Sequence, residues 1–333
     1  MDAAEIERIV RELPRLTGAQ LRRLATAVDQ TIQRREVEAI IEGDGDERPP
    51  CPRCQYRRTV RWGVANGNQR WRCPDCGKTF NKLSGTPLAY SKKPEQMFAA
   101  ALNMVGDQPR SCRKLADELG VHWMTVWRWR MKALRTLEAY GDRQLAGLVE
   151  ADETFFRESR KGSREWAYFR EGRGPQPPRP RWRDFDKKKA KLPRGLSRWQ
   201  VPVLVLRDRH GGTRATKLVG LDLSAFEPVL DQALATDAIL CTDGAAIYRR
   251  YGAKRGRVVE QVNTRQGIRT RGAIHIQNAN AFHARFKEFM RPFRGPSARY
   301  LPLYVGWMVF RDRRPPGAVE GNPLIERLLE EAP

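Results

Sequence analysis

The sequence predicts a mixed α/β domain preceded by two smaller modules, one built on cysteines and one all-helical. Three observations support this prediction. From Leu145 onward, apolar runs of strand length alternate with helical patterns, which is typical of α/β domains. Upstream, four cysteines fall into two Cys-x-x-Cys pairs. Three helical patterns lie between those pairs and Leu145, and a chain of 333 residues has room for two or three domains.

The charge of the chain indicates a polyanionic partner. Its formal net charge is +23 and its isoelectric point is near 10.3. Such a field attracts nucleic acid, because each phosphate that a cation neutralises releases a counterion. A polybasic membrane protein could share this charge, but the longest clean apolar run, Val201 to Leu206, has only the length of a strand. The N-terminus lacks an apolar signal core, so we expect a cytoplasmic, nucleoid-associated protein with no membrane partner.

The predicted boundaries follow changes in composition along the chain. From the N-terminus we expect a helical hairpin, a cysteine-based module, an all-helical module, the α/β domain and a tail, which span residues 1–44, 45–90, 91–140, 145–312 and 313–333. The α/β domain carries a basic insert at 157–199 that contains Trp166, Trp182 and Trp199. This insert is either a disordered loop or a clamp that binds a nucleic acid backbone and stacks on bases.

The N-terminal hairpin is predicted from helical spacing. A first apolar stripe precedes Pro14 and consists of Ile6, Ile9, Val10 and Leu13. Thr17 with Gln20 resembles a capping box that opens a longer helix. The hairpin could pair two protomers or pack on a neighbouring module, and the sequence leaves both alternatives open.

The cysteine pairs are Cys51 with Cys54 and Cys73 with Cys76. Two such pairs one hairpin apart indicate a zinc ribbon, because each pair offers two thiolates to one tetrahedral Zn²⁺ ion. Residues 59–64 and 69–72 alternate like strands around a turn at 65–68, which agrees with that module. The alternative is a pair of disulfides, which a reducing compartment disfavours.

Residues 91–140 follow a three-helix pattern. Pro94 suits the first turn of a helix that runs to about Val105. Ser111 can cap a second helix, and Gly120 allows a tight turn into a third. This spacing is typical of a helix-turn-helix domain, with an expected core of Leu115, Ala116, Leu119, Val121, Val126 and Trp129. Three residues of the third helix project away from that core and are candidates for contact with DNA: Thr125, Arg128 and Lys132. The alternative is a helical domain without base contacts.

The pattern of the α/β domain begins with a buried strand that runs through residues 150–156. Further strands are expected at 201–207 and 213–219, followed by a helix near 224–234. Two more strands, at 238–241 and 258–262, precede a last helix that contains Asn280. Three early strands, a helix, another strand and then helices are compatible with a ribonuclease H-like layout.

Two acids of this domain, Asp152 and Asp243, each stand at the polar end of an apolar stretch. Carboxylates at adjacent strand ends are what a hard divalent cation such as magnesium needs. By themselves, they are also compatible with turn residues that end strands. Glu150 shares the predicted face of Asp152 and is a candidate auxiliary acid, whereas strand alternation directs Glu153 to the other face.

The last helix has two faces of opposite character. Helical spacing gathers polar residues on one of them: Asn280, His283, Lys287, Arg291 and Arg294. Aromatic residues line the opposite face and are expected to be core: Phe282, Phe286, Phe289 and Phe293. The polar face is either a solvated surface or a surface that binds a polyanion, and its cations favour the second alternative.

Several stretches of the chain resemble a known family. They are CPRC, CPDCGKTF, EADETFF, CTDGAAIY and HIQNANAFHARFKEFMRPFRGPSARYLPLYVGW. From about Cys51 to Trp307, the chain resembles bacterial insertion-sequence transposases that have an N-terminal zinc ribbon and an Asp-Asp-Glu/Asn catalytic domain. The last stretch is the most specific, because its Asn, His and Lys and the aromatic residues that follow fall in the order of the family.

The resemblance implies a ribonuclease H-like fold, dependence on Mg²⁺ (with Mn²⁺ as an alternative ion), and cutting and joining of DNA at the ends of a mobile element. Asp152 and Asp243 match the two metal-binding aspartates of the family. Asn280 stands where many members have a third acid, a departure that some members share, and Lys287 matches the basic residue seven positions later. The resemblance also implies that the protein acts on DNA as a homo-oligomer.

In the mechanism that we expect, Asp152 bridges two magnesium ions and Asp243 holds one of them. The neutral carbonyl oxygen of Asn280 would hold its ion less firmly than a carboxylate would. Lys287 would bind phosphate near the cut. His283 could position DNA, shuttle a proton or only fill space.

Two alternatives come from other functional classes. The chain could be a non-catalytic or domesticated DNA-binding regulator derived from a transposase, and Asn280 is the reason to consider it. It could also be an RNA-binding zinc-ribbon protein, although that leaves the acidic pair unexplained.

Overall fold

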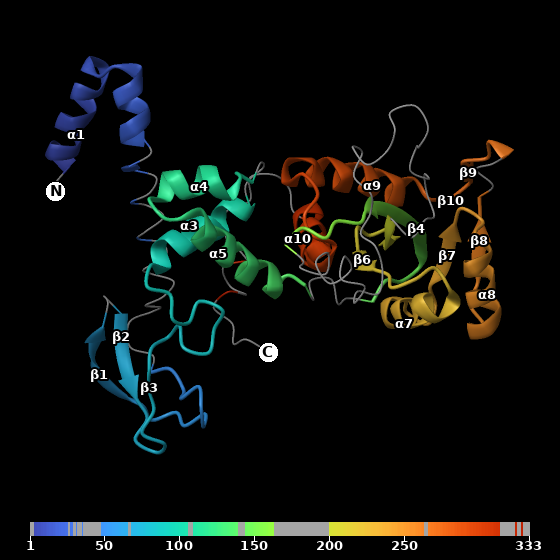
Figure 1. The fold of residues 1–333 in the computed structure, drawn as a ribbon, viewed down its shortest axis with the longest axis horizontal. Helices are drawn as coiled ribbons and strands as arrows, with labels where there is room; N and C mark the ends of the chain where they lie inside the picture. Colours follow the sequence, from blue (N-terminus) through green and yellow to red (C-terminus); the bar gives the residue numbers. More distant parts are fainter. Residues whose placement is uncertain are drawn as a thin grey trace, which may run out of the picture. The chain divides into compact units, whose positions relative to one another are not determined.

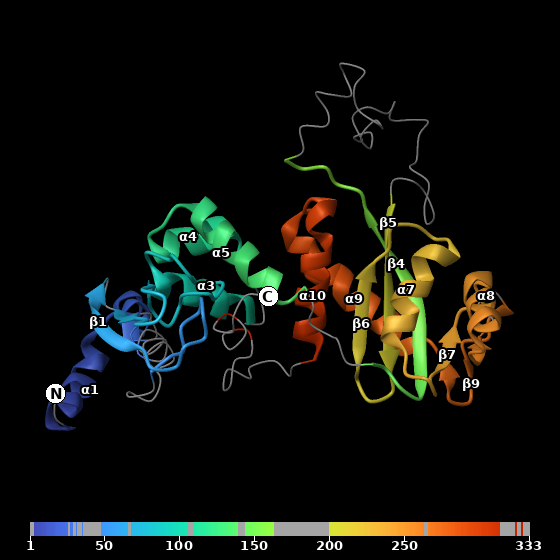
Figure 2. The ribbon, with the colours of Figure 1, turned by 90° about the horizontal axis from the view of Figure 1, so that it is seen from below.

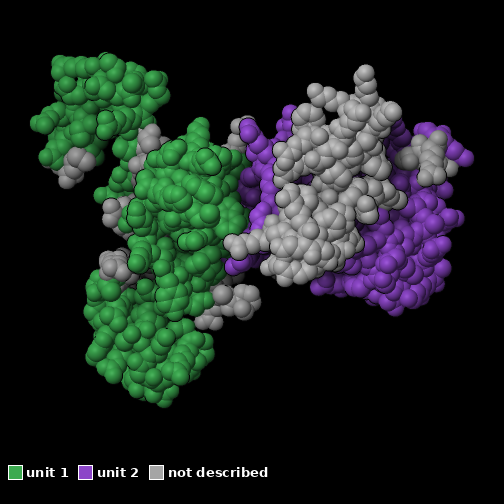
Figure 3. All heavy atoms as spheres, in the orientation of Figure 1, with its two compact units in different colours: residues 1–133, 319–333 green, residues 134–318 purple. Residues whose placement is uncertain are grey.

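The computed structural model describes residues 3–25, 27–28, 31, 35, 48–65, 68–105, 109–138, 144–162, 200–262, 266–313, 324 and 328. The chain divides into two compact units, which Figure 3 colours separately: unit 1 comprises residues 1–133 and 319–333, and unit 2 comprises residues 134–318. The finer division of unit 1 into three modules stays a prediction. None of the helices described is both long and apolar enough to cross a bilayer.

Unit 1 begins with the helix α1 (Ala3–Glu12) and a short 3-10 helix, η1 (Leu13–Arg15), that contains the predicted Pro14 stop. The capping box is present, since the Gln20 backbone N–H lies 3.4 Å from Thr17 Oγ1 and the Thr17 N–H donates to Gln20 Oε1 at 2.8 Å. Residues 18–25 are helical beyond that cap, as the sequence predicts.

The second part of unit 1 is a three-stranded antiparallel sheet of β1 (Val60–Ala65), β2 (Asn68–Arg72) and β3 (Thr79–Phe80), in that order (Figure 1). Ala65 pairs with Asn68, which confirms a tight hairpin, while the two residues between them lie outside the described residues. Trp71 and Phe80 form a small core with Cys51 and Cys73. So few apolar residues make a weak core, so this module needs a further source of stability.

Three helices complete unit 1: α3 (Pro94–Val105), α4 (Cys112–Leu119) and α5 (Trp123–Thr136), the last of which runs on into unit 2. The Ser111 side chain caps α4 by accepting from the Lys114 N–H, and Gly120 ends the helix at φ +61° in the left-handed region. The predicted core is confirmed, with Leu115, Ala116 and Val126 buried and Trp129 packed against them.

Unit 2 is built on a mixed five-stranded sheet in the order β6-β5-β4-β7-β8. Its strands are β4 (Leu148–Arg157), β5 (Gln200–Asp208), β6 (Thr213–Lys217), β7 (Ile239–Thr242) and β8 (Val259–Gln261). The central strand β4 is antiparallel to β5 and parallel to β7. A short hairpin follows the sheet, formed by β9 (Thr270–Arg271) and β10 (Ile274–His275).

Helices flank this sheet, as Figures 1 and 2 show. They are α7 (Leu223–Ala233), α8 (Ala246–Arg255), α9 (Gln277–Met290) and α10 (Leu301–Asp312). Val149 and Ala151 of β4 pack into a buried cluster with Phe226 of α7 and Tyr248 of α8. Asp152, on the opposite face of β4, lies beside α9. Unit 2 is therefore the mixed α/β domain that the sequence predicts.

Three predictions about unit 2 need correction or fall outside the structure. Asp152 lies in the middle of β4 rather than at its end, because β5 pairs along the whole of β4 whereas β7 pairs only with its first part. The last helix ends at Met290, and a 3-10 turn over Arg291–Phe293 follows it, because Pro292 has no N–H to continue the α-helical hydrogen bonds. Residues 163–199 of the basic insert, with its three tryptophans, and nearly all of the tail at 313–333 lie outside the described residues.

Candidate active site

The strand register brings the two predicted aspartates together. The parallel ladder between β4 and β7 runs from Leu148 and Ile239 to Ala151 and Thr242. Asp152 is the next residue of β4 and Asp243 is the first residue after β7, so both directly follow the last pair of the parallel ladder. Burial and the charge of Glu153 raise the pKa of Asp152, and the negative charge of Asp243 raises it further. Two aspartates this far apart in the sequence come close only because the strands that carry them pair in the folded sheet.

Asp152 is held in an environment that opposes its ionisation. Its side chain is 17% exposed. Burial, and then the charges of Glu153 and Asp243, raise its pKa to about 7, while its hydrogen bond from the Glu153 N–H and the nearby Lys287 ammonium act in the other direction. At neutral pH the site therefore holds a costly negative charge, which a bound cation would stabilise.

Asp243 is a turn residue, as one of its two alternatives predicts, and its role as a metal ligand stays a prediction. Its Oδ1 accepts from the Ala245 N–H at 3.1 Å, and Gly244 between them takes φ +94°. It is therefore a turn residue that leads the chain from β7 into α8. The turn occupies one carboxylate oxygen, and the half-exposed side chain leaves the second available for a ligand.

The helix α9 places His283 and Lys287 beside Asp152. His283 is buried, and its Nδ1 lies 3.7 Å from Asp152 Oδ2. Burial, with help from the Lys287 charge, lowers the pKa of His283 to about 4, so the ring is neutral at pH 7 and the contact is not an ion pair. His283 Nε2 has no hydrogen-bond partner within the described part of the chain. A neutral, buried imidazole disfavours the proton-shuttle alternative.

Asn280 lies one helical turn before His283 on the same side of α9, and it is exposed. Its role as a third oxygen ligand stays a prediction. The aromatic side of α9 is core, as predicted: Phe282 and Phe286 are fully buried, and Phe289 packs edge-on against Trp307 of α10.

Sequence reasoning missed a hydrogen bond between Glu153 and Tyr248. Glu153 lies on the face of β4 opposite to α9, as strand alternation predicts, and accepts a hydrogen bond from the Tyr248 hydroxyl of α8. Burial raises the pKa of Glu153, the Tyr248 hydrogen bond lowers it, and the charge of Asp243 raises it further. A third acid thus lies close enough to influence the pair. Only the pairing of α8 with the sheet could have revealed it.

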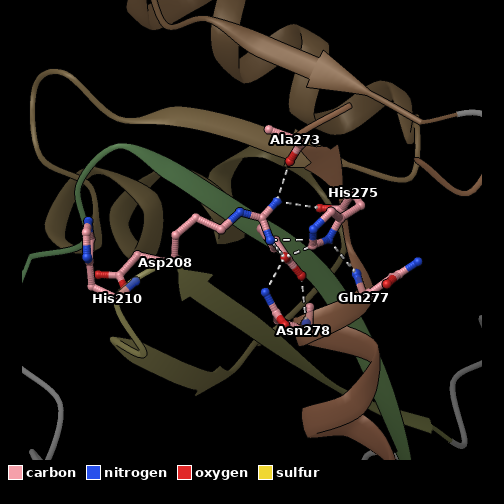
Figure 4. A network of polar contacts seen from close by, with 9 residues as sticks. Asp208, His210, Ala273, His275, Gln277 and Asn278 are labelled. Carbon is pink, nitrogen blue, oxygen red and sulfur yellow. Dashed lines mark hydrogen bonds and ion pairs between the residues drawn. The ribbon is translucent and has the colours of Figure 1, made fainter. Parts of the chain in front are cut away.

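The structure contradicts the auxiliary-acid prediction for Glu150. This side chain is fully buried, and both of its oxygens are occupied. It forms an ion pair with Arg209 and accepts hydrogen bonds from Asn278 and from the Ala279 N–H of α9 (Figure 4). A carboxylate with these partners is not available to a metal ion.

Two cations predicted on the polar face of the last helix lie beyond its last residue, Met290. Arg291 begins the 3-10 turn and pairs with Glu288 on the surface. Arg294 adopts a left-handed backbone at φ +51°, so it does not continue the helical spacing. Arg291 therefore keeps a helical backbone just after α9, whereas Arg294 leaves the face that contains Lys287.

The predicted DNA-contacting residues of α5 differ in their availability. Arg128 is exposed and Thr125 is half-buried. Lys132 is also half-buried, and its Nζ lies 3.4 Å from the Ala89 carbonyl oxygen. Arg128 is therefore the best placed of the three to contact a ligand.

The four cysteines form a separate site in unit 1. Their sulfur atoms lie within 4.8 Å of one another, with Cys51 and Cys76 at 3.5 Å and Cys54 and Cys73 at 3.6 Å. Sulfurs about 2.3 Å from one tetrahedral ion lie roughly 3.8 Å apart, so the spacing fits zinc. All four are free thiols, which argues against the disulfide alternative. Among the residues described, this is the only group of three or more Cys, His, Asp or Glu side chains that close together.

Burial opposes ionisation of Cys51, but hydrogen bonds from the Arg53 and Cys54 backbone and from neighbouring thiols outweigh it and lower its pKa to about 7. The N–H groups of the knuckle therefore favour a thiolate at the position where zinc needs one. The cluster is compatible with a structural zinc site, as the spacing of the cysteines predicts.

Comparisons with known proteins agree with these features. Residues 144–312, just over half of the chain, match the family model described as the ISXO2-like transposase domain. A protein described as an uncharacterized protein in transposable element ISH50, from Halobacterium salinarum, is 26% identical over 286 residues, which cover 85% of this chain and 90% of that relative. A crystal structure of a pre-cleavage Mos1 transpososome aligns with 63% of this chain and 76% of its own at 14% identity, but its TM-score of 0.23 carries no argument about the fold. The family match covers the whole of the mixed sheet and all four of its flanking helices, and on that ground the chain belongs to the ISXO2-like transposase family.

Proposed function

We propose that this protein is a DNA transposase that cuts and joins the ends of its element in a magnesium-dependent reaction, on a ribonuclease H-like domain. The observation that carries the proposal is the register of β4 and β7, because it sets Asp152 beside Asp243. The family and the net charge of +23 support the same conclusion. The relative whose name assigns it to a transposable element also supports it.

The residues at this site fit a hard divalent cation. Two carboxylates interact, and the pKa of Asp152 is raised by burial and by its acidic neighbours. Oxygen ligands in an anionic setting suit magnesium or manganese. Bound there, such ions would activate a hydroxyl nucleophile and stabilise the leaving oxygen at a scissile phosphate.

Each residue around the pair has a separate task in this proposal. Asp152 and Asp243 hold the cation, and Asn280 contributes a neutral amide oxygen from α9. Lys287 binds the phosphate beside the cut, since its ammonium already influences Asp152. His283 stays neutral and holds Asp152 in place from the interior of the domain.

DNA outside the cut is held by cations of both units. We assign Arg128, with Thr125 and Lys132, to the element end, and the exposed Arg291 and Arg294 to the DNA backbone near the site. The four cysteines hold a structural Zn²⁺ that folds the ribbon. We expect a homo-oligomer to assemble on the two element ends.

The test is cleavage of DNA that carries the inverted repeats flanking the gene. Zinc-loaded protein with Mg²⁺ is expected to nick or join these ends, and Asp152→Asn or Asp243→Asn to lower the rate by about 10³-fold or more, since several kcal/mol of transition-state stabilisation are lost. Asp231→Asn is the matched control, because this α7 carboxylate contacts Tyr251 and Arg255 instead of the acid pair. It should cleave at the wild-type rate.

The same experiment separates the alternatives. Binding to the repeats without cleavage under any divalent ion would overturn the transposase proposal and favour a DNA-binding regulator. Preference for RNA over the repeats would favour an RNA-binding ribbon protein. Equal cleavage by wild type and Asp152→Asn would contradict the assignment of the site.

A further inference from the structure

Glu150 of β4 caps the N-terminus of α9, which has no cap from its own N-cap residue. The residue before the helix is Ile276, whose side chain offers no cap. In its place, Glu150 Oε2 accepts from the Ala279 N–H at 2.8 Å, and Glu150 Oε1 accepts from Asn278 Nδ2 at 2.9 Å. A carboxylate at this end also interacts favourably with the positive end of the helix dipole. The cap of α9 is therefore supplied by the central strand of the sheet.

Arg209 secures that carboxylate in the interior. It forms an ion pair with Glu150, and its Nη2 donates to the Ala273 carbonyl at 2.7 Å. His275 Nδ1 lies 3.2 Å from Glu150 Oε1. As the labelled residues in Figure 4 show, the cluster gathers around β4 the segment that leads into β10, β10 itself and the first turn of α9. Because Glu150 is completely buried, its charge needs all of these partners.

The turn between β5 and β6 that contains Arg209 is held by hydrogen bonds of its own. Asp208 Oδ1 accepts from the His210 N–H at 2.9 Å and from the Gly212 N–H at 2.7 Å, which closes the turn between β5 and β6. Any side chain at Gly212 would collide with Asp208 and Leu145. The guanidinium therefore leaves a rigid turn rather than a loose loop.

Two acids of β4 meet α9, and farther along both elements Phe156 packs against Phe286 with ring centroids 4.6 Å apart. Glu150 and Asp152 are two residues apart on the same face of β4, about 6.6 Å along the strand. Ala279 and His283 are four residues apart on α9, about 6 Å along the helix. Glu150 contacts Ala279, and Asp152 lies beside His283. These two contacts have matching spacings, so together with the Phe156–Phe286 pair they limit how far α9 can slide along β4.

We propose that Glu150 is a positioning residue of the candidate site. By holding the first turn of α9, it fixes where Asn280 and Lys287 lie along β4 relative to Asp152. This inference rests on the proposed function, because it assigns Glu150 a part in the geometry of that reaction. Glu150 itself does not touch substrate or metal. It acts through the first turn of α9.

The test uses zinc-loaded full-length protein and measures hydrogen exchange at the Ala279 amide, without any divalent ion at the acid site. Glu150→Gln retains the shape of the side chain, but its amide N–H₂ must face a donor in either orientation: the Ala279 N–H, or Arg209 and Asn278. We expect exchange at Ala279 to accelerate about tenfold or more. Adding Asn278→Asp restores a carboxylate opposite that amide and should recover most of the protection.

Asp312→Asn is the matched control. Asp312 is also a buried carboxylate between two arginines, Arg207 and Arg285, but it meets α9 beyond His283. It should lower the melting temperature without accelerating exchange at Ala279. Unchanged exchange in Glu150→Gln, or equal acceleration in Asp312→Asn, overturns the inference. Should Glu150→Gln fail to fold, Asn278→Ala removes one contact at an exposed position and must still accelerate exchange at Ala279.

Kinetics provide the second readout. Glu150→Gln should lower kcat for DNA cleavage by about 10²-fold, the usual result of a misplacement near 1 Å, with little change in KM. Asp312→Asn should keep the wild-type kcat at a temperature where both variants are folded. Faster exchange at the Ala279 amide of Glu150→Gln together with a wild-type kcat would overturn the positioning role. Absence of cleavage by the wild type would instead refute the proposed function, and the exchange result would still decide whether Glu150 holds α9.

Discussion

The cysteine cluster and the acid pair both gather side chains suited to a metal ion, but they are assembled over different distances in the chain. The four cysteines come from two knuckles joined by one hairpin, so local turns alone bring the sulfurs together. Asp152 and Asp243 belong to strands that are far apart in the sequence and meet through a parallel ladder. A local site can therefore be recognised from spacing alone, whereas a site between distant strands depends on the whole sheet.

The two sites also differ in chemistry. Four soft sulfur donors close around one position, which leaves no place for a substrate and suits a structural ion. The acid pair offers oxygen donors that are only partly buried, and it keeps an unfavourable charge at Asp152. In our proposal, metal binding at the first site stabilises the fold, and metal binding at the second site serves a reaction.

The largest effect is expected from removing the metal of the cysteine cluster. The core beside it contains little more than Trp71 and Phe80, and structural zinc contributes apparent binding free energies of about 10–16 kcal/mol. A strong chelator, or Cys51→Ser, should unfold β1 to β3 while unit 2 keeps its structure. Hydrogen exchange, read separately for the two units, measures this.

The matched control for that experiment is Cys112→Ser, since this thiol packs among the helices outside the cluster. It should bind one zinc per chain, as the wild type does. Retention of ribbon protection after complete zinc removal would contradict the difference drawn between the two sites.

The next effect concerns the stability of the metal-free acid site. The pKa of Asp152 rises from 3.8 to about 7 in the folded protein. The folded protein therefore favours protonated Asp152. The contribution of this group to the free energy of unfolding is lost as the pH rises from about 4 to about 7. Asp152→Asn removes this cost, so at pH 8 it should be more stable than the wild type by up to about 4 kcal/mol. Near pH 4 the two should be alike.

Urea unfolding without divalent ions, at pH 4.5, 6 and 8, measures this trend. Adding Mg²⁺ at pH 8 should stabilise the wild type and have little effect on Asp152→Asn. A variant that is less stable than the wild type at pH 8 would show that Asp152 is not under electrostatic strain.

A smaller effect is expected at Tyr248. Its hydroxyl is the donor to Glu153, and Glu153 lies close enough to Asp152 to raise its pKa. Tyr248→Phe leaves a buried acceptor without this donor and should cost about 1–3 kcal/mol of unfolding free energy. Tyr251→Phe is the matched control on the same helix, and it should cost less because its partner Asp231 is half-exposed. Equal losses would place Glu153 outside the acid site.

Much of unit 1 and the framework of unit 2 could be predicted from the sequence. Helix caps such as Ser111 and the Thr17–Gln20 box are local, and so is the cysteine spacing. The sequence predicts that the two aspartates lie close together because each follows an apolar run. The depth of the pair in the sheet was not predictable, since the pairing of β5 along all of β4 keeps Asp152 inside the strand.

The contacts that sequence reasoning missed all cross between distant elements. The sequence suggests Glu150 as an auxiliary acid, because no residue near it in the chain indicates that it caps a helix more than a hundred residues later. The Glu153–Tyr248 hydrogen bond likewise needs the packing of α8 on β4. Helical spacing predicts that Arg294 lies on the polar face of the last helix. The helix ends before Arg294, because Pro292 cannot continue its hydrogen bonds.

The most direct test of the acid site is a titration of zinc-loaded protein with Mn²⁺, followed by electron paramagnetic resonance, in the wild type, Asp152→Asn and Asp243→Asn. We expect the wild type to bind Mn²⁺ at a site from which Mg²⁺ displaces it. Each variant should lose that binding, because we propose that the two carboxylates at the end of the β4–β7 ladder hold the ion together. Equal Mn²⁺ binding by all three proteins would contradict the account.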